Sequence, residues 1–339
     1  MAFLSVIIPT YHRNDLLALC LERLAPGRQE GGMLKAESGK LKLETGKLKA
    51  EIQNEDQGTP NSKPQTPNPT FTYEVIVTDD GAATTAEELV RTRFPWVRWT
   101  AGPRRGPAAN RNHGARRAAG DWVAFIDDDC LADPAWLHHV AAAAGGATWD
   151  VIEGRTIIPD RRDSPFLHGV ENTTGGCYWS CNLSVRREIF LRMGGFDEDF
   201  LIAGGEDMEF AWKIRSRKMR AHFCPPALVL HPQRPYALKA FLRSIWDRKW
   251  ILLYRQKTGG APPASAGRVR IGMAVVRDHF FALARNLAYG WRDLHRDNWK
   301  AGLFGMFWPW MVLPLQLPHL IWWEFCFRRQ RGTAVPLVK

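Results

Sequence analysis

The stretch Trp122-Val123-Ala124-Phe125-Ile126-Asp127-Asp128-Asp129 is the most informative part of this chain. Five apolar or aromatic residues in a row, β-branched at Val123 and Ile126, indicate a strand that is buried on both faces. Three carboxylates follow at the carboxyl end of that strand, which is the edge where open α/β sheets bind ligands. Adjacent like charges repel each other unless water or a cation neutralises them, so this edge is the first candidate for a functional site.

The acidic triplet predicts a divalent cation site. Alternation along an extended strand would put Asp127 and Asp129 on one side and Asp128 on the other. Two carboxylates on one side can share Mg²⁺ or Mn²⁺, which keeps open positions for substrate phosphates. The alternative is a solvated acidic turn in which Asp133 and Pro134 start the next helix. That alternative accounts for Asp133 but not for three acids directly behind a buried strand, so we favour the cation site.

Composition limits the kinds of partner. With 339 residues, of which 45% are hydrophobic, the chain can form one large domain with an appendage, or two domains. The net charge of +11 suits phosphorylated substrates, nucleic acid or an anionic membrane surface. The 15 tryptophans, many of them in the last third, favour a membrane interface. No RNA-binding signature or zinc-finger spacing is present, so we expect no nucleic-acid partner.

The six cysteines form no CxxC pair, and a chain of this length does not need a disulfide framework. Cys177 and Cys181 lie four residues apart without a matching His or Cys pair, which argues against structural zinc. The N-terminal segment 1–9 lacks a basic leader and a clear cleavage site, and it is interpreted as a first strand.

Strand and helix patterns alternate along residues 1–235, and we assign this range to one catalytic α/β domain. The alternation predicts a mostly parallel, right-handed doubly wound central sheet flanked by helices. The expected strands are 3–8, 73–78, 96–100, 122–126, 150–158, 182–185 and 221–230, and the expected helices are 16–24, 85–93, 108–119, 134–144, 187–193 and 204–214.

Residues 28–70 interrupt this alternation with a polar, low-complexity segment. It contains three heptapeptide copies, over 32–38, 39–45 and 46–52, and each begins with glycine. A coiled coil needs two apolar seams per heptad and tolerates glycine poorly. We therefore predict a disordered insertion in a surface loop, with a partner-binding helix as the alternative.

The C-terminal part divides into a helical extension over 236–299 and a Trp-rich apolar segment over 300–331. The second segment is long enough to span a bilayer, but Pro309, Pro314 and Pro318 break it into short pieces. We expect it to lie in or dip into the membrane interface, with the protein peripheral or monotopic at the cytoplasmic face of the cell membrane. A helical hairpin packed on the catalytic domain remains the alternative.

Four motifs, in this order, resemble the inverting nucleotide-sugar glycosyltransferases of family 2, which have the Rossmann-like GT-A fold. The resemblance covers residues 3–232 except for the 28–70 insertion, which is not part of the family pattern. Any one motif alone is weak, whereas four in order are specific. The motifs are Ser5-Val-Ile-Ile-Pro-Thr-Tyr11 with Arg13, Val77-Thr-Asp-Asp-Gly81, Ala109-Asn-Arg-Asn112 leading to Phe125-Ile-Asp-Asp-Asp129, and Gly194-Gly-Phe-Asp-Glu-Asp-Phe200 with Gly205-Glu-Asp207.

The resemblance implies transfer of a sugar from a UDP-, dTDP- or GDP-sugar to a glycan or lipid-linked acceptor hydroxyl, with Mg²⁺ or Mn²⁺. Cell-surface polysaccharide, lipid-linked glycan and glycolipid synthesis are the settings it suggests. On the donor side, it implies substrate contacts from Pro9, Thr10, Tyr11, Arg13, Asp79, Asp80, Arg111, Asp127 and Asp128. It further implies metal contacts from Asp129, Asp127 and His231, a catalytic base at Asp207 beside Glu206, and acceptor contacts from Trp179 and Asn182.

The chemistry agrees with this division of roles. Displacing a nucleoside diphosphate builds negative charge on the leaving phosphate, which a divalent ion and an arginine offset. The acceptor hydroxyl must lose a proton as it attacks, so one carboxylate must reach it. Simpler interpretations remain for single residues: Asp207 as a helix-capping acid, Asp79 as a turn acid, and Trp179 as core packing.

Two other functions are compatible with parts of the pattern. A nucleotide-sugar-binding scaffold at the membrane would keep the pocket without transfer, although it has less reason to retain Asp127, Asp129, Asp207 and Arg111 together. A sugar-phosphate nucleotidylyltransferase would need a Gly-rich basic loop after the first strand, and residues 9–13 contain no glycine.

Overall fold

The computed structural model describes residues 2–29, 43–44, 47–48, 71–82, 85–146, 148–162, 167–235, 253–255 and 257–259. The chain forms two compact units. The first comprises residues 1–161, 169–198 and 210–232 and holds the central sheet, and the second comprises residues 162–168, 199–209 and 233–339.

The first unit is built on an eight-stranded sheet with the order β5-β4-β1-β6-β10-β8-β11-β7. Buried β-branched and aromatic runs form its central strands, as the sequence pattern predicts. The strands are β1 Phe3–Thr10, β4 Thr72–Asp79, β5 Val97–Ala101, β6 Trp122–Phe125, β7 Leu131–Ala132, β8 Val151–Ile157, β10 Leu183–Arg186 and β11 Ala221–Leu230.

The sheet is mixed. β5, β4, β1 and β6 are parallel neighbours, whereas β10 is antiparallel to both β6 and β8, and β7 is antiparallel to β11. The expected parallel, doubly wound arrangement therefore holds for the half that contains β1, and β10 interrupts it in the other half. Because β1 lies between β4 and β6, the chain order reverses there, and the carboxyl ends of these three strands form a switch point of the kind that binds ligands.

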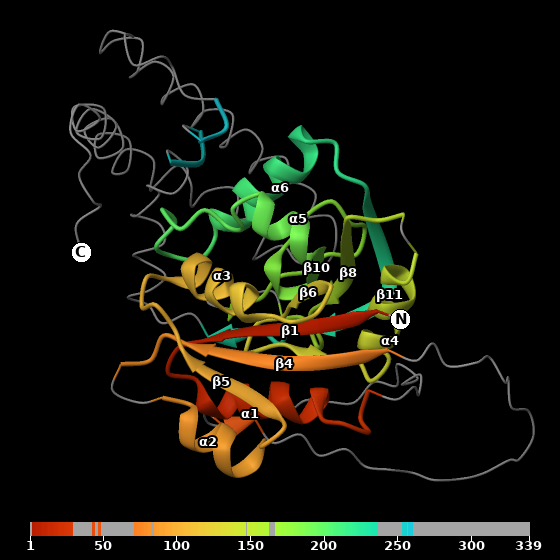
Figure 1. Ribbon diagram of the computed structural model, residues 1–339. Coiled ribbons are helices and arrows are strands. Elements are labelled where there is room, and N and C mark those ends of the chain that lie inside the picture. The colour runs from red at the N-terminus through yellow and green to blue at the C-terminus, as the bar shows by residue number, and fades with distance from the viewer. Residues whose placement is uncertain are drawn as a thin grey trace, which may run out of the picture. The chain divides into compact units, whose positions relative to one another are not determined.

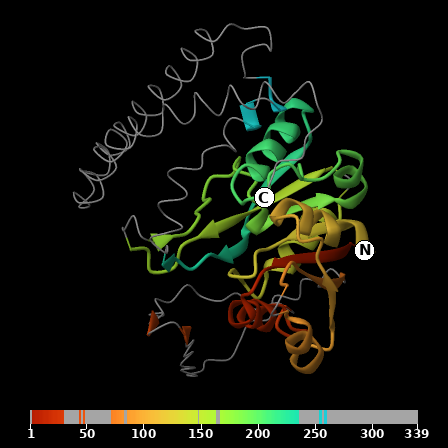
Figure 2. The same ribbon diagram turned by 90° about the vertical axis from the view of Figure 1, so that its left-hand side faces the viewer.

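Helices cover both faces of the sheet, and α1 and α2 lie on the side opposite α3 (Figure 1, Figure 2). In α1 and α2, apolar residues face the strands and the charged residues stay at least partly exposed, whereas α3 also buries Arg111. The helices are α1 Asn14–Leu24, α2 Glu87–Arg93, α3 Pro107–Arg117, α4 Trp136–Ala144, α5 Arg187–Arg192 and α6 Glu206–Ser216.

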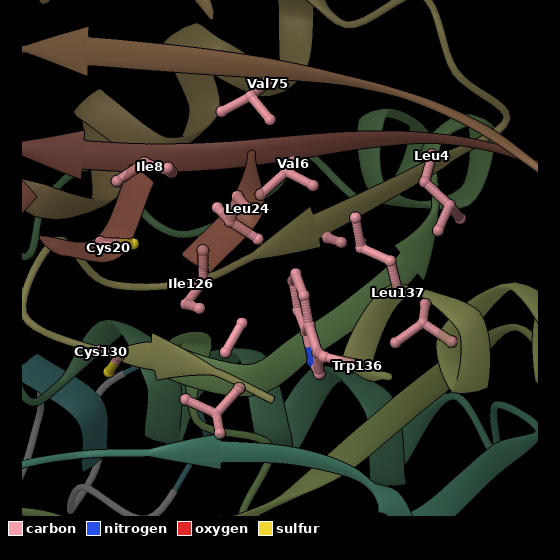
Figure 3. Close-up of a cluster of buried hydrophobic side chains, with 14 of the residues drawn as sticks. Leu4, Val6, Ile8, Cys20, Leu24, Val75, Ile126, Cys130, Trp136 and Leu137 are labelled. Atoms are coloured by element: carbon pink, nitrogen blue, oxygen red, sulfur yellow. The ribbon is translucent and has the colours of Figure 1, made fainter. Parts of the chain in front are cut away.

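The two faces of β1 serve two separate cores. Leu4, Val6 and Ile8 point to one side, where they join residues of α1, α2 and α4 (Figure 3). Ile7 points to the other side and packs with residues of α3, α5 and α6. This alternation is the period of two expected for a strand that is buried on both faces.

Four phenylalanines dominate the second core. Phe190 and Phe196 lie 5.1 and 5.2 Å from Phe125, measured between ring centroids, and Phe210 lies 4.8 Å from Phe196. Tilted and edge-on contacts of this kind stabilise a core by about 0.5–1.5 kcal/mol per pair beyond area burial. These contacts pack the end of β6, directly before the acidic triplet, against α5 and α6.

Most helix and strand boundaries lie within two or three residues of the predicted ones. The short strand β7 was not predicted, and it pairs with the end of β11. The helix α4 begins at Trp136 rather than at Pro134, and the Asp133 carboxylate accepts a hydrogen bond from the Ala135 amide just before it. Asp133 therefore closes the turn that precedes α4.

Of the 28–70 insertion, the structure describes Arg28 and Gln29 and two short paired strands, β2 Leu43–Glu44 and β3 Lys47–Leu48. Gln29 is buried and ties the end of α1 to the start of α4, because its amide donates to the Arg23 and Asp133 carbonyls and accepts from the Leu137 amide. The rest of the insertion, most of the 236–299 extension and all of 300–331 lie outside the described residues.

The described part of the second unit is small. Strand β9 Leu167–His168 pairs with β12 Arg234–Pro235, and Lys257 forms an ion pair with Asp199. Helix α6 starts here, and its residues from Phe210 onward belong to the first unit. Within the described ranges, no helix combines the length and apolar character that crossing a bilayer requires.

Candidate active site

Three strands bring their carboxyl ends together in the first unit. Thr10 is opposite Asp79 in the β1–β4 pair, and the Asp80 amide donates to the Thr10 carbonyl at 3.0 Å. On the other side of β1, the Ile126 amide donates to the Ile7 carbonyl, which places the acidic triplet beside Thr10. The parallel register thus assembles the sites that the sequence predicted from separate motifs.

Asp79 and Asp80 have different surroundings. Asp79 is buried, and its carboxylate accepts hydrogen bonds from the amides of Gly81 and Ala86 at 2.8 and 2.5 Å and from the Trp99 indole at 3.3 Å. These bonds are those of an acid that closes a turn, and the predicted substrate contact of Asp79 stays a prediction. The Asp80 carboxylate accepts from the Arg104 amide at 2.9 Å; burial raises the pKa of Asp80, and the backbone N–H groups of Arg104 and Gly106 counter only part of that effect.

Asn110 and Gly102 shape the surroundings of Asp80, and neither was among the predicted site residues. The Asn110 amide nitrogen donates to the Thr10 and Thr78 carbonyls, so it joins the ends of β1 and β4. Its Oδ1 is buried and has no hydrogen-bond partner among the described residues. A Cβ at Gly102 would lie 2.2 Å from Asp80 Oδ1 and 2.5 Å from Asn110 Oδ1, so only glycine leaves this space open.

The acidic triplet is a turn and not the end of a strand. β6 ends at Phe125, and the Cys130 amide closes a turn onto the Asp127 carbonyl. The predicted alternation, with Asp127 and Asp129 on one side, is therefore wrong, because the period of two applies only to extended backbone. The three carboxylates instead have three different sets of partners.

Asp127 pairs with an arginine. Arg111 Nη2 lies 2.7 Å from Asp127 Oδ1, and the Arg111 side chain is only 6% exposed. Burial acts to raise the pKa of Asp127, but the charge and hydrogen bond of Arg111, followed by His231 and Arg13, outweigh it, so that the pKa is lowered. The guanidinium also stands 5.8 Å from the Phe196 ring centroid, which fixes its plane.

Asp128 is held by β1 and by the residue that precedes α1. Thr10 Oγ1 donates to Asp128 Oδ2 at 2.8 Å, and Arg13 Nη1 donates to Asp128 Oδ1 at 3.0 Å. Burial, opposed by Arg13 and reinforced by the neighbouring Asp129, raises the pKa of Asp128 to about 7. The same Arg13 nitrogen lies 3.4 Å from Asp129 Oδ2, so one guanidinium bridges two of the three acids.

Asp129 also faces the end of β11. His231 Nε2 lies 4.0 Å from Asp129 Oδ1, and both side chains are 3% exposed. Cys130 joins them: one ligand atom from each of these three residues lies within 4.8 Å of the other two. Carboxylate, imidazole and thiol are all cation ligands, so this group fits a divalent ion, and it brings together two of the three predicted metal residues.

The remaining predicted donor-side residues lie on β1 and directly after it. Pro9 is buried in the strand, whereas Tyr11 is 59% exposed and makes an edge contact with His12 at 4.3 Å between ring centroids. His12 adopts a positive φ of 53°, which turns the chain sharply between β1 and α1. Tyr11 is thus a large exposed aromatic next to Thr10, free to stack against a ligand.

The buried Asn182 side chain makes three hydrogen bonds within the first unit. Its Oδ1 accepts from the Trp136 indole at 2.9 Å, and its Nδ2 donates to the Arg155 and Ala227 carbonyls at 2.9 and 3.0 Å. Both amide donors are used and the side chain is buried, which leaves little for an acceptor sugar. Trp179 is partly buried and packs against the first core, and its predicted acceptor contact stays a prediction.

Glu153 organises the loop that leads to Trp179, and it was not among the residues predicted from the sequence. This carboxylate is 2% exposed and accepts hydrogen bonds from Asn172 Nδ2 at 2.8 Å, the Gly176 amide at 2.5 Å and the Tyr178 amide. A buried acid that satisfies two loop amides holds the loop in one conformation.

Asn112 plays a similar part for the Gly-Gly-Phe-Asp-Glu motif. Its Oδ1 accepts from the Phe196 amide, and its Nδ2 donates to the Phe196 carbonyl and to Glu198. A Cβ at Gly195 would lie 2.3 Å from Asn112 Oδ1, and φ at Gly195 is +65°, so glycine is required there. Asn112 and Phe196, which are 84 positions apart in the sequence, thereby join two of the sequence motifs.

Glu206 and Asp207 occupy the first turn of α6, in the second unit. Glu206 accepts a hydrogen bond from the Gly204 amide at 2.8 Å. Acids at this end of a helix are stabilised by the exposed backbone N–H groups. The assignment of Asp207 as the base therefore stays a prediction.

Comparison with known proteins identifies relatives over this same region. The profile of "Glycosyl transferase family 2" matches residues 63–189, and that of "N-terminal domain of galactosyltransferase" matches residues 172–233. A validoxylamine A glucosyltransferase of Streptomyces hygroscopicus subsp. limoneus is 28% identical over 257 residues, which cover 63% of this chain and 48% of that protein. A pre-mycofactocin glycosyltransferase of Mycobacterium tuberculosis is 28% identical over 182 residues, which cover 47% and 37%.

Among solved structures, the mannosyltransferase PcManGT from Pyrobaculum calidifontis, in complex with GDP-Man and Mn²⁺, superposes with a TM-score of 0.51. The match has 17% sequence identity and covers 94% of this chain and 86% of that one. At that identity the likeness concerns the fold, and it confirms the expected α/β architecture of the GT-A type.

The chain spans less than half the length of the curated relatives it matches first. The matched region nevertheless contains Asp79 and Asp80, Arg111 and the whole acidic turn, and the second profile continues to His231. The motifs, the fold and these relatives agree with glycosyltransferase family 2, whose profile matches residues 63–189 of this chain.

Proposed function

We propose that this protein is an inverting, metal-dependent glycosyltransferase that moves a sugar from a nucleoside diphosphate to an acceptor hydroxyl. The observation that carries the proposal is the convergence of Asp80 with the acidic turn Asp127–Asp129 at the carboxyl ends of β4, β1 and β6. A basic side chain, Arg111 or Arg13, contacts each member of the acidic turn, as a site for an anionic donor requires.

The nucleoside end of the donor is assigned to the β1–β4 side. The Asp80 carboxylate faces Gly102 and can accept hydrogen bonds from a base. The unpartnered Oδ1 of Asn110 offers a further acceptor beside it. Tyr11 is exposed next to Thr10 and can stack on the base or the ribose.

The diphosphate end is assigned to the acidic turn. Arg111 is held by Asp127 and Phe196, so its position is fixed before any ligand arrives. Asp129 and His231 would hold a divalent cation, and their donor set fits one. When bound, that cation offsets the negative charge of the departing diphosphate; Mg²⁺ and Mn²⁺ both suit this task.

The proton acceptor of the reaction is assigned to Asp207, in the first turn of α6. Direct displacement with one base on the face opposite the leaving group inverts the anomeric carbon. Asp207 would take the proton from the acceptor hydroxyl, and Glu206, beside it, would support the first turn of α6.

We also propose where the protein acts and on which class of acceptor. The net charge of +11 and the Trp-rich sequence over 300–331 support work at the cytoplasmic membrane face, on a lipid-linked or polysaccharide acceptor.

The test is turnover of UDP-, dTDP- and GDP-sugars by the full chain, with Mn²⁺, with Mg²⁺ and after EDTA treatment. Metal-dependent release of one nucleoside diphosphate, abolished in Asp207→Asn while nucleotide binding persists, is the expected result. Nucleotide binding by calorimetry, without transfer or donor hydrolysis on any acceptor, would instead favour the binding scaffold.

A further inference from the structure

The group that faces the cation position contains a cysteine. Asp129, Cys130 and His231 are 6%, 0% and 3% exposed, and one ligand atom from each lies within 4.8 Å of the others. Cys130 Sγ is 3.9 Å from Asp129 Oδ1, the oxygen that also lies 4.0 Å from His231 Nε2. The sulfur therefore lies as close to the shared carboxylate as the imidazole does.

Cys130 lies at the border of the first core. Figure 3 shows it on the side of the cluster away from Leu4 and Leu137, beyond Ile126. A buried free cysteine ordinarily behaves as a small apolar residue. Here the preceding residue, Asp129, carries a carboxylate that the sulfur contacts, and the histidine directly after β11 completes a mixed set of oxygen, nitrogen and sulfur ligands.

We propose that Cys130 is a third protein ligand to the divalent cation, together with Asp129 and His231, and that it makes the site selective for a thiophilic ion over Mg²⁺. This inference rests on the cation site of the proposed function and specifies its ligands. Mg²⁺ takes oxygen ligands and is bound poorly by a thiolate, whereas Zn²⁺ and Co²⁺ accept oxygen, nitrogen and sulfur together.

The distances are compatible with such a site after a small closure. Metal–oxygen and metal–nitrogen bonds of about 2.0–2.1 Å and a metal–sulfur bond of about 2.3 Å put tetrahedral ligand atoms roughly 3.3–3.7 Å apart. The observed separations of 3.9 and 4.0 Å need only small side-chain rotations to reach that range. Three protein ligands leave a fourth position open, which is the pattern of catalytic sites and not of closed structural ones.

The decisive measurement is the absorption spectrum of the full chain loaded with Co²⁺. A cobalt–thiolate bond produces a charge-transfer band in the near ultraviolet, in addition to the weaker visible bands that any bound Co²⁺ shows. We expect that band in the wild type and its loss in Cys130→Ser, with the visible bands retained. We also expect Zn²⁺ affinity to fall by on the order of tenfold or more in Cys130→Ser, with a smaller change for Mg²⁺.

Two matched variants test the assignment to Cys130. Cys20→Ser removes another fully buried cysteine, whose sulfur contacts the Asp127 carbonyl at 3.6 Å, and it should keep the charge-transfer band. Cys224→Ser removes a buried cysteine whose sulfur lies 4.0 Å from the His139 carbonyl, and it should keep the band as well. A band that persists in Cys130→Ser, or that disappears in Cys224→Ser, overturns the proposal.

A second measurement uses the wild type alone, in case the variant fails to fold. X-ray absorption at the zinc edge should show one sulfur neighbour at about 2.3 Å. A shell of oxygen and nitrogen only would refute a role for Cys130 and leave the glycosyltransferase proposal intact. Failure of the wild type to bind any divalent ion or nucleotide would refute both.

Discussion

Arg111 Nη2 donates to Asp127 Oδ1 at 2.7 Å, and this bond joins α3 to the turn after β6. The guanidinium is nearly buried, whereas the Asp127 side chain keeps 25% of its surface exposed. The Asp127 carboxylate is therefore partly exposed to solvent, while the Arg111 guanidinium also contacts the Phe196 ring. Arg111 is thereby held at the place where we propose that the donor diphosphate binds.

Replacing Arg111 with Met should remove donor turnover and also destabilise the fold. Loss of the arginine leaves Asp127 with an uncompensated charge, which costs about 3 kcal/mol when breaking a largely buried pair. The double variant Arg111→Met, Asp127→Asn removes that charge, so it should recover most of the lost stability without recovering turnover. Denaturant unfolding and donor hydrolysis measure the two effects, and recovery of turnover in the double variant would contradict the assigned role.

The pKa of Asp128 predicts a dependence of stability on pH in the metal-free protein. Because the folded-state pKa is raised to about 7, above the unfolded value, the folded state binds the extra proton between those two values. The free energy of unfolding should therefore fall as pH rises from about 4 to about 7 and then level off. Asp128→Asn should remove the decrease in the free energy of unfolding that Asp128 causes between these pH values. If the variant and the wild type, both measured in EDTA, show the same dependence of this free energy on pH, Asp128 does not titrate in that range.

Gly102→Ala should weaken nucleotide binding strongly. Its Cβ would lie 2.2 Å from Asp80 Oδ1, so that carboxylate must move, at a cost of about 1–3 kcal/mol for overpacking. Gly146→Ala is the matched control, because its Cβ has no neighbour closer than 3.7 Å. Calorimetric titration with the nucleoside diphosphate should separate the two variants by on the order of tenfold or more in affinity; equal affinities would exclude Asp80 from the pocket.

Asn182→Ala should lower stability without changing the specific activity of the folded enzyme. The substitution leaves the Trp136 indole and the Arg155 and Ala227 carbonyls without their buried partner, which costs about 1–3 kcal/mol for each unsatisfied group. Thermal unfolding and the KM for the acceptor check the two parts. A raised acceptor KM at full stability would restore the sequence-based prediction that Asn182 contacts the acceptor.

Truncation after Gly290 should release the protein from membranes. The removed part contains the Trp-rich apolar sequence over 300–331, whose composition favours the bilayer interface. Flotation with vesicles that contain anionic lipid measures the effect, and nucleotide binding by the truncated chain confirms that its catalytic part is folded. A truncated protein that still floats with vesicles would show that the anchor lies elsewhere.

Local patterns were enough to locate the two strands that end in acids. Val75–Val77 and Val123–Ile126 are short apolar runs that contain β-branched residues. Both runs are buried on both faces, because one core packs against each face of the sheet. The family resemblance assigned Asp80 and the acidic triplet to the same donor site. The alternation of Asp127 and Asp129 was not a sound inference, since the backbone turns directly after Phe125.

The sequence by itself thus determined the α/β fold class and the positions of the acids after the buried strands, because these depend on short runs of residues and on their order. Only the tertiary structure decided that Arg13 bridges Asp128 and Asp129, that Asn112 holds the Phe196 loop, and that Cys130 and His231 meet at one carboxylate. Those contacts join residues that are up to 116 positions apart, and their geometry depends on the reversed strand β10 and on side-chain packing, which no local period encodes.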